Sequence, residues 1–240
     1  FMELKLIGNI CNYACLMCSP ASSSKIAEEL EIPFPKYFKH SNEWWDDFKE
    51  VSKEYNYFKF SGGEPFMSPT TKKIIEILIN SGRSHNIKLQ FNTNGSASKS
   101  VLQRLLNKFK SVNICFSIDA WGERNSLIRK HSSWDFTEDR IWDYLTLLVN
   151  NKNMTMSIHP CVSILNIGYL YEFENVIKQF KFTYRFNFSV SNTLAYPLYY
   201  NAAYLPQTIK QAYLENNSEF LNSDLCDASN SVISLLEADG

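Results

Sequence analysis

The sequence lacks several features that would place it in a familiar class of protein. No apolar run approaches the roughly 18 residues that a membrane-spanning helix needs. The 24 basic and 25 acidic residues nearly cancel, so no excess of one sign favours binding to a nucleic acid or a membrane surface. No internal repeat or low-complexity stretch is present. These absences argue against membrane, nucleic-acid and repeat functions.

Two further absences concern location and cofactor. The sequence shows no secretory signal and no disulfide framework, which together favour a reducing cytoplasm. No G-x-G-x-x-G follows the first apolar strand, which argues against a dinucleotide-binding enzyme. What is present is a chain of 240 residues with 45% apolar content, enough for one sizeable domain with its own core.

Three cysteines, Cys11, Cys15 and Cys18, lie within eight residues in the pattern Cys-x3-Cys-x2-Cys. Three thiolates on one short loop can bind three irons of a [4Fe–4S] cube and leave the fourth iron open. Structural zinc is an alternative, although it usually takes four ligands and no fourth Cys or His is nearby. Unreactive thiols are another alternative. Because an open iron can bind a cofactor and pass an electron to it, the spacing favours a reaction centre.

Short strand-like runs alternate with helical patterns along the chain, which is typical of a parallel α/β sheet. Strands are predicted over 3–9, 57–61, 87–92, 112–119, 155–164 and 184–191. Apolar residues at helical spacing predict helices over 44–55, 70–80, 101–109 and 141–149. Ser68 followed by Pro69 predicts one helix start, and Asp135 with Glu138 predicts a capping box at another.

The last three predicted strands alternate between apolar and polar residues. In strand 112–119, for example, Val112 and Ile114 face one way, whereas Asn113 and Cys115 face the other. Parallel strands covered on both faces are instead apolar throughout. One face is therefore expected under helices and the other around a hydrated or ligand-filled space. A partial barrel fits this pattern, and an open sheet with one poorly covered face is the alternative.

Polar or glycine-rich motifs stand at four successive predicted strand ends. The carboxyl ends of parallel strands meet at one edge, so these motifs are expected at a common mouth. They are the cysteine loop, Ser61-Gly62-Gly63-Glu64-Pro65, Asn92-Thr93-Asn94-Gly95 and Ser117-Ile118-Asp119.

With these motifs the chain resembles the radical S-adenosylmethionine (SAM) superfamily over about residues 4–192. It is most similar to the peptide- and protein-modifying group that includes anaerobic sulfatase maturases and their shorter twitch-type relatives. The resemblance implies an α/β fold, a partial (β/α)6 TIM-like barrel over 1–192. It also implies a C-terminal cap over 193–240 that completes the barrel edge and lacks the cysteine set of an auxiliary cluster.

The resemblance further implies two cofactors, a [4Fe–4S] cluster held by Cys11, Cys15 and Cys18, and SAM. The implied reaction is reductive cleavage of SAM to a 5′-deoxyadenosyl radical, which abstracts a hydrogen atom from a peptide or protein. An electron donor such as flavodoxin or ferredoxin is the second implied partner. The same chemistry on a nucleotide or small metabolite is an alternative, as is a non-catalytic iron–sulfur or zinc protein.

The polar end of SAM is assigned to the second and fourth strand ends by the same resemblance. Gly62 and Gly63 would let the backbone approach the SAM amine, with Glu64 nearby. The family's arginine after strand four maps to Arg129, and Arg124 is the competitor for the SAM carboxylate.

The nucleoside end of SAM is assigned to other positions. Ser117 and Asp119 suit the ribose hydroxyls as acceptors, and Asp119 could instead cap the following helix. Asn94 either supports the same pocket or forms an ordinary turn. Met17 stands where the family usually has an aromatic residue against adenine, and Tyr13 is a possible substitute.

Cysteines outside the loop are Cys115, Cys161 and Cys226. A small buried side chain is the ordinary interpretation of each. Cys161, near His159, is the better candidate for a catalytic thiol that returns a hydrogen atom to a substrate radical. Tyrosines cluster over 196–204, where they either close the open side of the barrel or contact an extended substrate.

Overall fold

The computed structural model describes residues 1–5, 8–33, 39–181, 187–188, 192–216, 218, 232–234 and 236–237. Its strands are β1 (Met2–Leu4), β2 (Ala14–Cys15), β3 (Tyr57–Phe60), β4 (Lys88–Thr93), β5 (Ser111–Phe116), β6 (Arg129–Lys130), β7 (Met154–Ile158), β8 (Cys161–Val162), β9 (Asn187–Phe188) and β10 (Asn192–Thr193). Its helices are α1 (Ser24–Glu29), α2 (Asn42–Val51), α3 (Pro69–Asn80), α4 (Lys99–Leu106), α5 (Glu123–Ile128), α6 (Trp134–Asn150), α7 (Leu170–Lys181) and α8 (Gln207–Asn216).

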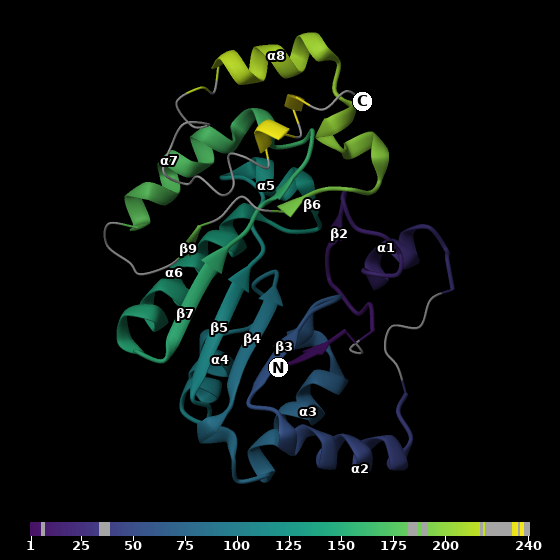
Figure 1. Ribbon diagram of the computed structural model, residues 1–240, viewed down its shortest axis with the longest axis vertical. Coiled ribbons are helices and arrows are strands. Elements are labelled where there is room, and N and C mark those ends of the chain that lie inside the picture. Colours follow the sequence, from purple (N-terminus) through teal and green to yellow (C-terminus); the bar gives the residue numbers. More distant parts are fainter. Residues whose placement is uncertain are drawn as a thin grey trace.

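A parallel sheet in the order β1-β3-β4-β5-β7-β9 forms the centre of the described chain. The strand order follows the chain, because helices carry the backbone back to the start of each following strand. In Figure 1, β4, β5 and β7 point toward the end of the molecule at which β2, β6 and α5 lie. The predicted parallel α/β sheet is confirmed, and its carboxyl ends gather at one edge.

The two faces of the sheet differ as the alternating pattern predicts. Phe58, Phe91 and Ile114 are fully buried in a core that they share with apolar residues of α3, α4 and α6. Burying each such side chain contributes roughly 1.5–3 kcal/mol relative to leaving it exposed. On the opposite face of β5, Asn113 and Cys115 are only half-buried. The polar face of the sheet is therefore the one that borders the open interior.

The predicted strand over 155–164 is wrong in its extent. It divides into β7 and β8, and β8 pairs with β10 in a separate two-stranded sheet. Pro160 stands between them and has no N–H to donate, so the β7 ladder cannot continue through it. Of the strand predicted over 184–191, only β9 lies within the described residues, and Cys226 lies outside them.

Several helices, α1, α2, α3, α4 and α6, start after a serine whose side chain caps them. The predicted cap of α3 is confirmed, because Ser68 Oγ accepts a hydrogen bond from the Thr71 N–H at 3.3 Å. The capping box predicted from Asp135 and Glu138 is wrong, because Ser133 caps α6 and places Asp135 inside its first turn. None of the helices in the described ranges has the length and apolarity that crossing a bilayer requires.

Candidate active site

The cysteine loop is anchored at both of its ends. Strand β2 pairs antiparallel with β6, which sets Cys15 opposite Arg129. The Cys18 N–H donates to the Cys15 carbonyl at 2.9 Å. At the other end, Ser24 Oγ accepts from the Cys11 N–H at 3.1 Å and lies 3.2 Å from the Cys11 carbonyl. Backbone pairing and one serine thus position the loop beside the fourth strand end.

The thiols of the loop lie among hydrogen-bond donors. Arg129 Nη1 is 3.8 Å from Cys15 Sγ, and Asn94 Nδ2 is 3.7 Å from Cys11 Sγ. A hydrogen bond with the Cys18 thiol and the charge of Arg129 lower the pKa of Cys15 to about 7, against the effect of burial. Burial raises the pKa of Cys11 to about 11. The loop therefore favours one thiolate in advance of metal, and thiolate is the form that binds iron.

These residues fit an iron–sulfur cube better than a single ion. Within the described residues, no three His, Cys, Asp or Glu side chains are grouped to hold one metal ion. A cube spreads its ligands, because each thiolate binds a different iron. Arg129 Nε is also buried without a hydrogen-bond partner among the described residues, which leaves a donor for an anionic group. Hydrogen bonds to the sulfurs are among the features by which proteins tune such clusters.

The glycine pair packs tightly against the cysteine loop. Gly62 and Gly63 both have positive φ, at 88° and 50°. A Cβ on Gly63 would lie 2.6 Å from the Ile10 carbonyl oxygen, so no side chain fits there. The Glu64 N–H donates to the same carbonyl at 2.7 Å. The close approach that glycine permits is made here to the residue before Cys11, and approach to the SAM amine stays a prediction.

Glu64 joins the second strand end to the third. Its carboxylate is fully buried and accepts from Thr93 Oγ1 and the Asn94 N–H, each at 2.8 Å, and from the Phe66 N–H at 3.2 Å. Burial raises the pKa of Glu64 to about 7, although these hydrogen bonds lower it. A carboxylate has about four lone-pair sites, so one is left for a further donor.

Asp119 and Arg129 form a buried ion pair at the fourth strand end. Asp119 Oδ2 lies 2.8 Å from Arg129 Nη2, and the two side chains are 0% and 12% exposed. Asp119 Oδ1 accepts from the Cys161 N–H at 2.9 Å, and the Asp119 N–H donates to Asn125 Oδ1. Burial opposes the charge of Arg129, but Asp119 together with the thiols of Cys15, Cys18 and Cys161 raises the pKa of the guanidinium above its usual range. The predicted contacts of this pair with SAM, to its ribose and its carboxylate, stay predictions.

Arg124 lies apart from this site. Its side chain is 41% exposed, pairs with Glu172 at 2.5 Å and lies over the ring of Tyr169. Of the two arginines considered for the SAM carboxylate, only Arg129 is placed beside the cysteine loop.

Comparison with known proteins places this arrangement in a family. The sequence profile described as the Radical SAM superfamily matches residues 6–173. The chain belongs to the radical SAM superfamily. Members of this superfamily use a [4Fe–4S] cluster and SAM, which are the two cofactors expected from the sequence. The chain is thus a radical SAM enzyme core, while no curated protein sequence matches it.

Solved structures share the fold of this radical SAM core. One is "Native anSMEcpe with bound AdoMet", with a TM-score of 0.64 and 20% identity over 95% of this chain and 62% of that one. Another is Streptococcus suis SuiB bound to precursor peptide SuiA, with a TM-score of 0.56 and 13% identity over 96% of this chain and 50% of that one. The predicted partial TIM-like barrel is confirmed. The chain spans less than two thirds of the length of either protein.

The remaining predicted residues of the radical SAM site lie around the same edge. Ser117 is half-buried, and its N–H donates to the Thr93 carbonyl at 2.8 Å. Met17 lines a pocket of about 740 Å³ with Cys15 and Cys18. Tyr13 is 3% exposed and is part of the buried packing.

Cys161 and His159 are both half-buried after the end of β7. Burial and the nearby Asp119 carboxylate raise the pKa of Cys161 to about 11, so its thiol keeps its hydrogen at neutral pH. Their predicted catalytic roles stay predictions.

Two asparagines were not expected from the sequence. Asn12 Oδ1 accepts from Asn94 Nδ2 at 2.9 Å and so joins the cysteine loop to the third strand end. Asn166 is 1% exposed, and its Nδ2 donates to the carbonyls of Asp119 and Cys161, each at 3.0 Å. Asparagine is spread along this chain, so only the position of Asn12 beside Cys11 could have indicated a role.

Proposed function

We propose that this radical SAM core cleaves SAM reductively and uses the resulting 5′-deoxyadenosyl radical to abstract a hydrogen atom from a peptide or protein. One observation carries the proposal: contacts join all four strand-end motifs into a single site. Asn94 contacts both Cys11 and Glu64, and Arg129 contacts both Cys15 and Asp119. A protein that only binds a metal has no need of several buried charged side chains around its thiols.

The proposed division of roles follows from these contacts. Cys11, Cys15 and Cys18 would hold the cluster, which when bound and reduced supplies the electron that cleaves SAM. Arg129 offsets the negative charge of the thiolates and keeps its guanidinium beside Cys15, where an anionic group of SAM also gains from it. Asp119 holds Arg129 in that position. The half-buried polar face of the sheet then borders the space in which the radical meets its substrate.

A peptide or protein substrate is supported by the pocket beside the cysteine loop. Its volume is about 740 Å³, within the roughly 300–1,000 Å³ of sites that hold a small molecule, so it has room for the part of a peptide that reaches the cysteine loop. Besides Cys15 and Met17, Tyr196 and Tyr199 line it, and these tyrosines are 73% and 71% exposed. Tyrosine combines apolar area with a hydroxyl group, which suits a polar extended chain. The similar SuiB structure holds a precursor peptide.

Cys161, near His159, is proposed to return a hydrogen atom to the substrate radical: its S–H bond breaks as a C–H bond forms. The thiyl radical left on the sulfur then regains the thiol by taking up one electron, from the external protein that reduces the cluster, and one proton from water. The Cys161→Ala variant keeps the backbone N–H that Asp119 accepts from, so the ion pair stays intact. It should still form 5′-deoxyadenosine but lose most of the modified product. Retention of full product formation would remove the role.

The function is tested by anaerobic reconstitution with iron and sulfide. The protein should turn brown and release 5′-deoxyadenosine from SAM when dithionite is added. Cys15→Ala should abolish both properties, whereas Cys115→Ala, outside the loop, should keep them. A colourless protein, one that binds zinc alone, or a Cys15→Ala variant that still cleaves SAM would refute the proposal.

A further inference from the structure

The segment from residue 65 to residue 110 is strongly basic. It carries eight Lys and Arg residues and a single acidic residue, Glu76, in a chain whose net charge is −1. The segment includes α3, β4 and α4, and its exposed basic residues are Lys72, Lys73, Lys88, Lys99, Arg104, Lys108 and Lys110. The positive charge is thus concentrated in one segment of the chain, which supplies both α3 and α4.

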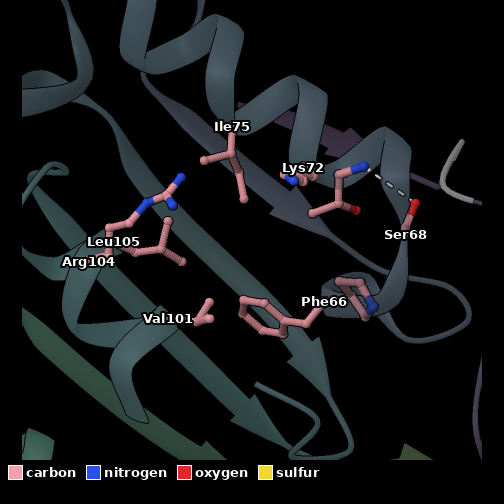
Figure 2. Close-up of a pocket in the computed structure, with 9 residues that line it drawn as sticks. Phe66, Ser68, Lys72, Ile75, Val101, Arg104 and Leu105 are labelled. Atoms are coloured by element: carbon pink, nitrogen blue, oxygen red, sulfur yellow. Dashed lines mark hydrogen bonds between the residues drawn. The ribbon is translucent and has the colours of Figure 1, made fainter. Parts of the chain in front are cut away.

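A groove lies between α3 and α4 within this basic region. Figure 2 shows Ile75 of α3 and Val101 and Leu105 of α4 directed into it, with Phe66 at one end. Lys72 and Arg104 also line the groove, and both are exposed. Neither has an ion-pair partner in the described part of the chain. The groove therefore combines an apolar floor with two available cations.

The volume of the groove indicates what kind of ligand fits it. Its volume is about 190 Å³, whereas pockets for small molecules are usually about 300–1,000 Å³. A space this small fits one apolar side chain of a partner protein, and the surrounding cations favour a partner with carboxylates around that side chain.

The groove is structurally joined to the cysteine loop. Its lining residues Pro65 and Phe66 directly follow Glu64. The Glu64 N–H donates to the carbonyl of Ile10, the neighbour of Cys11, at 2.7 Å. One hydrogen bond thus connects the residue before that end of the groove to the residue next to Cys11.

We propose that the groove between α3 and α4 docks the acidic protein that reduces the cluster. The inference rests on the proposed function, which needs one electron from outside the chain for each cleavage of SAM. That electron leaves the donor, which is oxidised by one electron, and enters the cluster, which is reduced by one. Complexes of this kind are small and weak, and charge complementarity sets their rate of encounter. Flavodoxin-type and ferredoxin-type proteins are donors of this class.

The test compares two reductants on the holoenzyme. Reduced flavodoxin, an acidic protein, must dock to deliver its electron, whereas dithionite is a small ion that needs no docking surface. The double variant Lys72→Glu/Arg104→Glu should release 5′-deoxyadenosine at least tenfold more slowly with flavodoxin at low ionic strength and at an unchanged rate with dithionite. Lys152→Glu, an exposed lysine outside the basic segment, is the matched control and should behave as the wild type with both.

Salt provides a second readout. The flavodoxin-driven rate of the wild type should fall steeply with added NaCl, and that of the double variant should change little. If the double charge reversal also slows the dithionite-driven reaction, the neutral double variant Lys72→Gln/Arg104→Gln is tested in its place. Its flavodoxin-driven rate, divided by its dithionite-driven rate, should then be lower than the same ratio for the wild type.

Three outcomes would overturn the inference. They are an unchanged flavodoxin-driven rate in the variants, an equal loss in Lys152→Glu, and binding of an RNA oligonucleotide to the wild type more tightly than flavodoxin. Failure of the proposed function looks different, since the wild type would then form no 5′-deoxyadenosine even with dithionite.

Discussion

The Arg129 guanidinium contacts two strand-end motifs at once: Nη2 lies 2.8 Å from Asp119 Oδ2, and Nη1 lies 3.8 Å from Cys15 Sγ. The acidic partner orients the arginine, and the arginine stabilises charge on the thiol. Because both charges are buried, water cannot solvate the one that remains when its partner is removed.

Asp119→Asn should therefore destabilise the metal-free protein by about 3–5 kcal/mol, because it leaves Arg129 buried without its counter-ion. Asparagine keeps an oxygen for the Cys161 N–H, so the decrease in the free energy of unfolding measures the effect of removing the charge alone. Urea unfolding measures it. Arg124→Ala is the control, since its exposed pair with Glu172 should contribute at most about 1 kcal/mol. Equal decreases in the free energy of unfolding in the two variants would show that the buried Asp119–Arg129 pair contributes no more than the Arg124–Glu172 pair.

Arg129→Ala should weaken SAM binding to reconstituted protein by about 1.5–3 kcal/mol, the usual loss for a hydrogen bond to a charged group. Calorimetric titration with SAM measures the affinity, in samples matched for iron content. Arg124→Ala should bind SAM as the wild type does, because Arg124 lies apart from the cysteine loop. An unchanged affinity in Arg129→Ala would assign the SAM carboxylate to another residue.

Gly63→Ala should displace the cysteine loop and lower the iron bound after reconstitution. The added Cβ would lie 2.6 Å from the Ile10 carbonyl oxygen, a backbone atom that cannot move alone. Gly82→Ala is the control, because Gly82 also has positive φ, at 72°, but has no atom within 4 Å of the added Cβ. It should lose only about 1–2 kcal/mol of stability from backbone strain and bind iron normally. Similar iron contents in the two variants would show that the contact with Ile10 is dispensable.

The sheet could be predicted, and the cysteine loop singled out, because each depends on local pattern. Alternation in strand 112–119 separates the buried Val112 and Ile114 from the half-buried Asn113 and Cys115 in the structure. The spacing of the cysteine triplet indicates a metal loop without any tertiary information. Pro160 was the missed local signal, since its missing N–H ends β7.

The partners of the site residues could not be predicted, because they come from segments distant in the sequence. Asn94 contacts Asn12 across 82 positions, and Asn166 contacts the Asp119 carbonyl across 47. Asp119 is an acceptor by chemistry alone, but whether it faces Arg129 or a ligand depends on how β6 pairs with β2. Pattern identifies which strand end a residue occupies, whereas tertiary packing decides what it contacts.

Glu64 should make the stability of the metal-free protein depend on pH. Its pKa is about 7 in the folded chain, against 4.5 for a free carboxyl group, so the folded state binds the proton more tightly. Its contribution is then complete below about pH 4.5 and is lost as the pH rises through about 7, a difference of about 3 kcal/mol. Urea unfolding at pH 5 and pH 8 measures it.

Glu64→Gln isolates this contribution, since glutamine keeps an oxygen for the Asn94 N–H but does not titrate. The wild type should lose about 2.5 kcal/mol more than the variant between the two pH values, because all other titrating groups are shared. If the wild type and the variant lost the same stability between pH 5 and pH 8, the three donated hydrogen bonds would be holding Glu64 ionised at both pH values. The distinction matters for the site, because only an ionised Glu64 can accept a hydrogen bond from a protonated amine of SAM with its full charge.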